Sequence, residues 1–354
     1  MSSVRKIAKD LGVSVATVSR ALNNHPDVKD STRQAVLDAA NRTGYAPKLG
    51  KRLTNIIGLV YPTNPVQADY GAFESAILTG ILKGVDEQRF DVTIINLARD
   101  KRDDETYTHF FMRKGIRGVI VRTIDTEPKL AEAIAAEGFP CLAIAEVARG
   151  GKLNSICSDS KADSARAVEH LVLNGHRRIA LGHHLVLDHD HRQRLEGYLE
   201  GLRRHDIPVD ETIMFSAPGT IEGGSAVLDR ILRHENPPTA VYLTTPLMTM
   251  GALHRCLQHG LHVPTDLSVV GFDDADVRKT TFPPFTAVCQ DAQMMGLEAA
   301  RWLTRKLRGL ASGRFVEQRP THFDINASTG PAPDSPARLQ ADGRVLAASV
   351  QDAD

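Results

Sequence analysis

The chain has 354 residues with no net charge, and 42% of its residues are apolar against 24% charged. This composition is that of a folded protein and excludes disordered, collagen-like and disulfide-rich classes. No run of about 18 apolar residues occurs, and MSSVRKIAKD lacks the apolar core of a signal peptide, so we expect a cytoplasmic protein.

Charge is distributed unevenly along the chain. Residues 1–53 carry ten basic and four acidic side chains, although the chain as a whole is neutral. A cationic segment on an anionic body suits a module that meets nucleic-acid phosphates.

The first helical pattern runs from Val4 to Leu11, where apolar residues recur at helical spacing until Gly12. Ser14 then stands as an N-cap for a second helix that ends at Leu22. Two short helices joined by a tight turn predict a helix-turn-helix. A third helix is predicted over residues 31–43.

The outer face of the second predicted helix carries Ala16 and Arg20, flanked by Val15, Thr17 and Ser19. In a major groove, an arginine matches the two acceptors of guanine, and small apolar groups pack on thymine methyls. The pattern alone also allows a three-helix protein-interaction module in which Arg20 is a solvated surface charge.

From Asn55 onward, apolar runs alternate with amphipathic stretches. Strands are predicted in IIGLVYP, DVTIINL, RGVIVRT, PCLAIA, RRIALG, TIMFSA, TAVYLT and LSVVGFDD. Helices are predicted near residues 74–89, 103–114, 128–137, 161–174, 191–205, 222–234 and 246–260. This alternation predicts two α/β lobes with parallel sheets. Dinucleotide, P-loop and G-x-S-x-G motifs are absent, so we expect neither nucleotide binding nor an enzyme.

The stretch VRKIAKDLGVSVATVSRALNNHPDVKDSTRQAVLDAANRTGYAP resembles the DNA-binding domain of the LacI/GalR family of transcriptional regulators. The segments EHLVLNGHRRIAL, RLEGY, VPTDLSVVGFDDAD and FPPFTAV resemble landmarks of that family's ligand-binding core. The resemblance implies an all-α head (residues 1–46), a hinge (47–54) and a two-lobed core like periplasmic binding proteins (55–330). Residues 331–354 contain Pro331, Pro333 and Pro336, and we expect a mostly disordered tail.

The resemblance also implies which residues meet DNA. Val15, Ala16 and Arg20 correspond to base-contacting positions, and Thr17, Ser19 and Asn23 correspond to phosphate-contacting positions. Leu53 matches a leucine that wedges into the minor groove. The connector PKLGKRL is shorter than is usual and contains Gly50, so a flexible tether with Leu53 packed on the core is the alternative to a hinge helix.

Effector-binding positions are implied by the same resemblance. Arg194 and Asp273 match the arginine and the aspartate that bind the effector. Further matches, each open to the alternative of a surface ion pair or a strand-end cap, are Asp69, Tyr70, Phe73, Glu146, Asp159, Thr245 and Gln290. Thr245 stands where an amide is common in the family.

The segment HHLVLDHDHR (residues 183–192) concentrates four histidines and two aspartates, which are residue types that bind zinc or nickel. It lacks H-E-x-x-H spacing, and we expect polar ligand contacts or a solvated loop rather than a metal. No cofactor is expected. The four cysteines form no C-x-x-C pair and are expected to be buried.

These features predict a sequence-specific transcriptional regulator, a repressor that binds a pseudo-palindromic double-stranded DNA operator as a homodimer. A small molecule, a sugar or a sugar derivative, is expected to control operator binding allosterically.

Overall fold

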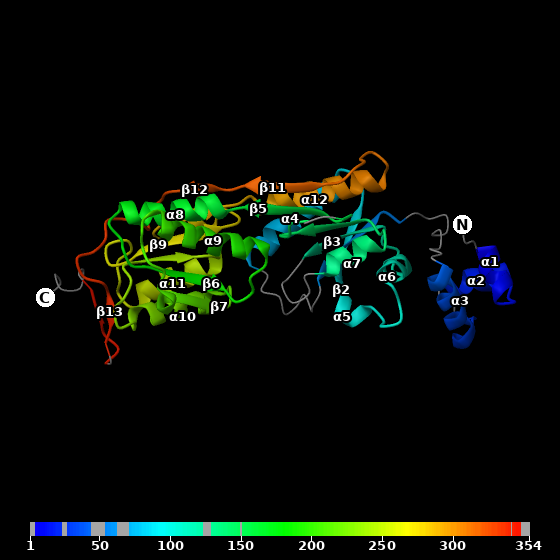
Figure 1. Cartoon of the computed structure of the whole chain (residues 1–354), viewed down its shortest axis with the longest axis horizontal. Helices are drawn as coiled ribbons and strands as arrows, with labels where there is room; N and C mark the ends of the chain where they lie inside the picture. The colour runs from blue at the N-terminus through cyan, green and yellow to red at the C-terminus, as the bar shows by residue number, and fades with distance from the viewer. Residues whose placement is uncertain are drawn as a thin grey trace.

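The computed structural model describes residues 4–22, 27–43, 54–61, 71–122, 129–148, 151–340 and 342–347. Three helices form a separate N-terminal head beside a two-lobed body (Figure 1). These helices are α1 (Val4–Asp10), α2 (Val15–Leu22) and α3 (Asp30–Thr43), close to the predicted bounds. Ile7, Val18 and Val36, one from each helix, are fully buried together in the core of the head.

The N-terminal lobe is built on a six-stranded sheet with strand order β11-β5-β4-β3-β1-β2. Every neighbouring pair in it is parallel. Its strands are β1 (Ile56–Tyr61), β2 (Asp91–Asn96), β3 (Gly118–Arg122), β4 (Cys141–Ile144), β5 (Asn154–Asp159) and β11 (Val316–Pro320). The helices of this lobe are α4 (Ala72–Asp86), α5 (Leu97–Asp100), α6 (Tyr107–Arg113), α7 (Leu130–Ala136) and α12 (Ala292–Leu307).

The C-terminal lobe repeats this plan with strand order β12-β10-β9-β8-β6-β7. Its strands are β6 (Ile179–His184), β7 (Met214–Ala217), β8 (Ala240–Leu243), β9 (Ser268–Asp273), β10 (Thr286–Cys289) and β12 (His322–Asp324). Only β12, paired with β10, is antiparallel in this sheet. The helices are α8 (Lys161–Leu173), α9 (His189–Arg204), α10 (Ile221–Leu232) and α11 (Pro246–Gln258), with two 3-10 turns (Glu211–Ile213 and Val277–Thr280).

Within the described ranges the chain passes between the lobes three times, after β5, after β10 and between β11 and β12 (Figure 1). Two α/β lobes with parallel sheets were predicted, and this prediction is confirmed. Where parallel strands end, the loops and helix starts of both sheets supply side chains to one boundary, which is the usual place for a ligand in such folds.

The predicted helix over residues 103–114 is wrong in its start. The Thr106 hydroxyl accepts a hydrogen bond from the His109 amide at 3.2 Å, so α6 begins only at Tyr107. The separate short helix α5 comes earlier, where Asn96 caps it through a hydrogen bond from the Arg99 amide.

The RLEGY segment lies on α9 and explains how two helices approach closely. A Cβ atom on Gly197 would come within 2.4 Å of the Ser164 Cβ and 2.5 Å of the Lys161 carbonyl on α8. The next residue, Tyr198, is fully buried and donates a hydrogen bond to the Ile179 carbonyl at 2.8 Å. Two of these motif residues therefore fix α9 in place, which positions Arg194 one turn earlier.

A glycine on α4 sets the contact between α4 and α12. A Cβ atom on Gly80 would meet the Gln293 carbonyl oxygen at 1.9 Å and the Leu297 amide nitrogen at 2.7 Å. Replacing Gly80 with Ala must separate the two helices, and we expect a loss of about 1–3 kcal/mol of stability. Chemical denaturation measures the effect, with the exposed neighbour Lys83→Ala as the control. Equal midpoints for the two variants would show that the helices do not pack this closely.

The expectation of a disordered tail is wrong for residues 331–340 and 342–347. Strand β13 (Arg338–Leu339) pairs with β14 (Val345–Leu346), and the flanking Ala337 and Ala347 are buried in the core that also contains α10. His176, fully buried, contacts the Gly330 carbonyl through Nε2 at 3.1 Å. None of the helices in the described ranges is long and apolar enough to cross a membrane.

Candidate functional site

Helix α2 of the head has a capped N-terminus. The Ser14 hydroxyl accepts a hydrogen bond from the Thr17 amide at 3.0 Å, as the predicted N-cap requires. Val18 and Ala21 point into the core of the head. The opposite side of α2 is exposed.

The residues predicted to contact DNA lie on that opposite side. Ala16, Ser19 and Arg20 are exposed, and Val15 exposes 47% of its surface, a high value for an apolar side chain. Thr17 is half-buried, and its hydroxyl lies 2.8 Å from the Ser14 hydroxyl. The predicted contacts Asn23 and Leu53 lie outside the described residues.

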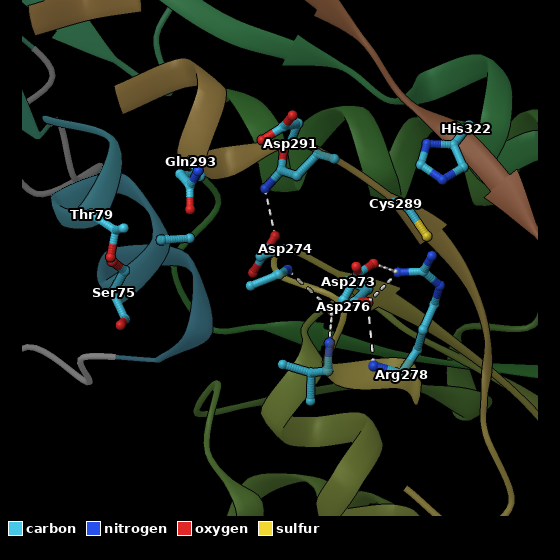
Figure 2. Close-up of a pocket in the computed structure, with 14 residues that line it drawn as sticks. Ser75, Thr79, Asp273, Asp274, Asp276, Arg278, Cys289, Asp291, Gln293 and His322 are labelled. Atoms are coloured by element: carbon cyan, nitrogen blue, oxygen red, sulfur yellow. Dashed lines mark hydrogen bonds and ion pairs between the residues drawn. The ribbon is translucent and has the colours of Figure 1, made fainter. Parts of the chain in front are cut away.

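A cavity of about 590 Å³ lies between the lobes, within the size range of small-molecule sites. Figure 2 shows α4, which carries Ser75 and Thr79, on one side of this cavity and Asp274 and Asp276, which follow β9, on the other, with Gln293 of α12 near α4. The remaining lining residues are Ala76, Asp273, Asp274, Ala275, Asp276, Val277, Arg278, Cys289, Gln290, Asp291 and His322.

The two aspartates of GFDD have different partners (Figure 2). Asp273 accepts hydrogen bonds on Oδ1 from the amides of Ala275 and Val277, and on Oδ2 from Arg278 at 2.8 Å. Asp273 was predicted to bind the effector, but both of its carboxylate oxygens accept hydrogen bonds from within the loop that follows β9. Asp274, the next residue, accepts a hydrogen bond from Gln290 Nε2 at 2.6 Å and is 4% exposed.

Arg194, on α9, is not among the residues that line this cavity, and only 3% of its surface is exposed. Its Nη1 donates to the Thr244 carbonyl at 2.6 Å, and its guanidinium stacks 3.5 Å from the centroid of Phe272. Neither contact neutralises its charge. That charge favours the ionised forms of Asp190 and Asp274.

An ion pair between Arg122 and Asp188 joins the two lobes. Arg122, at the end of β3, contacts Glu74 Oε1 at 2.7 Å and reaches Asp188 of the other lobe at 3.3 Å. The Asp188 carboxylate also accepts a hydrogen bond from the His191 amide at 2.9 Å, which caps α9. Burial and the charge of Asp188 raise the pKa of Asp190 above its ordinary value.

The structure places only some of the other residues that were predicted to bind the effector at the boundary between the lobes. Phe73 lies under the Arg122 guanidinium, 4.9 Å from centroid to Cζ, and so belongs to the boundary. Thr245 caps α11 by accepting a hydrogen bond from the Met248 amide at 3.3 Å. Glu146 accepts a hydrogen bond from the Val147 amide, and Asp159 is exposed at the end of β5. Asp69 and Tyr70 lie outside the described residues.

The histidine-rich segment is not simply a solvated loop. Asp188, His189 and Asp190 are buried, whereas Leu185 is 58% exposed. The rings of His184 and His191 stack with centroids 4.9 Å apart. The buried part of the segment thus belongs to the boundary between the lobes.

Sequence reasoning missed Arg122 as a boundary residue, whereas Asp188 and Asp190 lie in the histidine-rich segment for which polar ligand contacts were expected. Arg122 was detectable, because a charged residue that ends an apolar parallel strand lies where ligands bind.

The burial of Asp274 predicts a pH effect on stability. Burial raises the pKa of Asp274 to about 6, so the folded protein holds its proton more tightly than the unfolded chain does. Stability from this group is present at low pH and is lost as pH rises toward and through 6. We expect Asp274→Asn, measured against the wild type by denaturation, to gain about 1 kcal/mol in relative stability between pH 5 and pH 8. A constant difference across that range would contradict the assignment.

Comparisons with known proteins agree with this architecture. Residues 3–48 match the family described as bacterial regulatory proteins, lacI family, and residues 168–329 match the periplasmic binding protein-like domain. The chain is 30% identical over 338 residues to the transcriptional repressor CytR of Escherichia coli K12, covering 94% of this chain and 97% of CytR. It is 28% identical over 344 residues to the transcriptional regulator DegA of Bacillus subtilis, covering 93% and 98%.

A solved structure of the transcriptional regulator CelR in complex with cellobiose superposes with a TM-score of 0.66 at 26% identity, covering 93% of this chain and 100% of that one. A LacI-family regulator from Enterococcus faecium with bound ribose has a TM-score of 0.67 at 22% identity, covering 78% and 99%, and shows the fold alone. With a helix-turn-helix head, a two-lobed core and relatives that match along almost the whole length, this chain belongs to the LacI family of DNA-binding transcriptional regulators.

Proposed function

We propose that the chain is an operator-binding repressor whose DNA affinity is set by a polyhydroxylated small molecule, a sugar or sugar derivative, held between the two lobes. The supporting observation is a set of buried polar atoms at the boundary. Among the described residues, Arg194 Nε, Thr244 Oγ1 and Gln290 Oε1 are buried and have no hydrogen-bond partner. Buried polar atoms normally have a hydrogen-bond partner, so we expect these three atoms to bind water or a ligand.

The chemistry of these atoms favours hydroxyl groups. Arg194 Nε can only donate, Gln290 Oε1 can only accept, and the Thr244 hydroxyl can do either. A hydroxyl both donates and accepts, so neighbouring hydroxyls of a sugar satisfy such a mixed set. The relative CelR, whose structure contains cellobiose, supports the same class of ligand.

The remaining parts have separate roles. Val15, Ala16 and Arg20 read base edges, Thr17, Ser19 and Asn23 hold phosphates, and Leu53 in the hinge (residues 47–54) enters the minor groove. Two copies of the chain bind the two halves of a pseudo-palindromic operator. The effector acts by binding more tightly to one arrangement of the lobes than to another.

Thermal-shift screening of the purified full chain tests the effector class. The panel contains monosaccharides, disaccharides and their phosphates, with amino acids and nucleosides as the comparison classes. A ligand that binds only the folded state raises the melting temperature, and we expect the largest shift from a sugar. A shift produced by an amino acid or a nucleoside and by no sugar would overturn the proposed effector class while leaving the DNA-binding function intact.

A further inference from the structure

Three side chains with different donor atoms meet at the boundary between the lobes. Cys157 Sγ, a ring nitrogen of His189 and a carboxylate oxygen of Asp190 all lie within 4.8 Å of one another. Cys157 belongs to β5 of the N-terminal lobe, whereas His189 and Asp190 form the first turn of α9 in the C-terminal lobe. Cys157 and Asp190 are each 1% exposed.

Asp190 is oriented toward this group by its own hydrogen bond. The Ser158 amide donates to Asp190 Oδ1 at 3.3 Å. Asp190 Oδ2 is buried and has no hydrogen-bond partner in the part of the chain that the structure describes. A buried carboxylate oxygen without a donor is costly, and a cation placed against Oδ2 would remove that cost.

The elements that carry these donors are firmly held. Cys157 lies opposite Gln318 in the parallel pairing of β5 with β11, in the interior of a sheet. The first turn of α9 is fixed by its Asp188 cap, which Arg122 contacts from the other lobe. Such outer contacts are the usual means of orienting metal ligands.

We propose that Cys157, His189 and Asp190 form a zinc site that connects the two lobes. Thiolate, imidazole and carboxylate are the ligands that Zn²⁺ takes in proteins, and a thiolate disfavours Mg²⁺ and Ca²⁺. Bond lengths of about 2.0–2.3 Å place tetrahedral ligands roughly 3.3–3.8 Å apart, so small side-chain rotations from the present positions suffice. The fourth coordination position belongs to a water molecule or to a ligand atom.

This site goes beyond the effector proposal, and the position of Cys157 explains why the histidine-rich segment alone did not reveal it. The segment supplies two of the ligands, and the fold brings the third from the other lobe. Because zinc would link β5 to α9, it would restrict how far the lobes separate.

Cobalt titration of the chelator-treated full chain tests the site without DNA or sugar. We expect one Co²⁺ per chain, a near-ultraviolet thiolate-to-cobalt charge-transfer band, and displacement by Zn²⁺. Cys157→Ser should abolish the band, and His189→Gln and Asp190→Asn should each weaken Co²⁺ binding by at least about tenfold. The matched control Cys256→Ser removes another buried cysteine, on α11, and should keep the band.

Several results would overturn the zinc site. These are the absence of saturable Co²⁺ binding to the wild type, a band that persists in Cys157→Ser, or a binding loss caused by the neighbouring His183→Gln but not by His189→Gln. Far-UV circular dichroism establishes that each variant is folded. If Cys157→Ser does not fold, the comparison of the two histidine variants decides.

Discussion

The Arg194→Met variant is expected to lose the response to its effector while it still folds and binds operator. Methionine retains an apolar stem against Phe272, but it removes the donor at Nε and the positive charge that favours the ionised form of Asp274. Losing a buried charged hydrogen-bond donor costs on the order of 3 kcal/mol of binding, or at least about 100-fold in affinity. Calorimetric titration with the sugar that gives the largest thermal shift measures this loss.

Arg230→Met is a matched control for that experiment. Arg230 also stacks on a phenylalanine, Phe215, with 4.5 Å between its Cζ atom and the ring centroid, and it is exposed on α10. Its replacement should leave effector affinity within about twofold of the wild type, since exposed substitutions away from a site have small effects. Equal affinity losses in both variants would mean that Arg194 has no special place in the site.

Arg20→Ala is expected to reduce operator affinity sharply and to relax sequence selectivity. One arginine that reads a base contributes about 1–3 kcal/mol, and a dimer on two half-sites loses this contribution twice. The side chain is exposed on α2, so the head should keep its fold. Fluorescence anisotropy on an operator selected from random duplexes by the wild type, and on a scrambled duplex, measures both effects.

The Lys9→Ala variant distinguishes the part of DNA affinity that comes from base contacts from the part that comes from charge attraction to phosphates. Lys9 is an exposed cation near the end of α1, and its loss should weaken binding to both duplexes alike. If Arg20→Ala also lowered both affinities equally, then Arg20 would contact phosphate rather than a base edge.

Much of the fold was predictable because local signals agree with one another. Ser14 caps α2 as its position before an apolar helical pattern indicated, and the apolar runs at Ile56–Tyr61 and Ser268–Asp273 became buried parallel strands. The extent of order near the C-terminus was not predictable. Strands β13 and β14 contain two residues each, and their anchors Ala337 and Ala347 are too small to form a recognisable pattern.

The candidate site was predictable in its location but not in its contacts. Family resemblance implied that Arg194 and Asp273 lie in the cleft between the lobes, and in the structure Asp273 lines the cavity there. The hydrogen bonds of Asp273 depend on the turn after β9, in which Arg278 donates to its Oδ2. The contact between Arg122 and Asp188 joins residues of different lobes, and such a pairing is visible only once the chain is folded.

The most direct measurement is the operator affinity of the full chain with and without the sugar found by thermal shift, compared between the wild type and Arg194→Met. We expect the sugar to change the operator Kd of the wild type by about 5–150-fold, the usual range of allosteric coupling, and to leave that of Arg194→Met unchanged at the same concentration. An operator Kd that does not respond to the bound sugar in the wild type, or that responds equally in both proteins, would contradict control of DNA binding from this site.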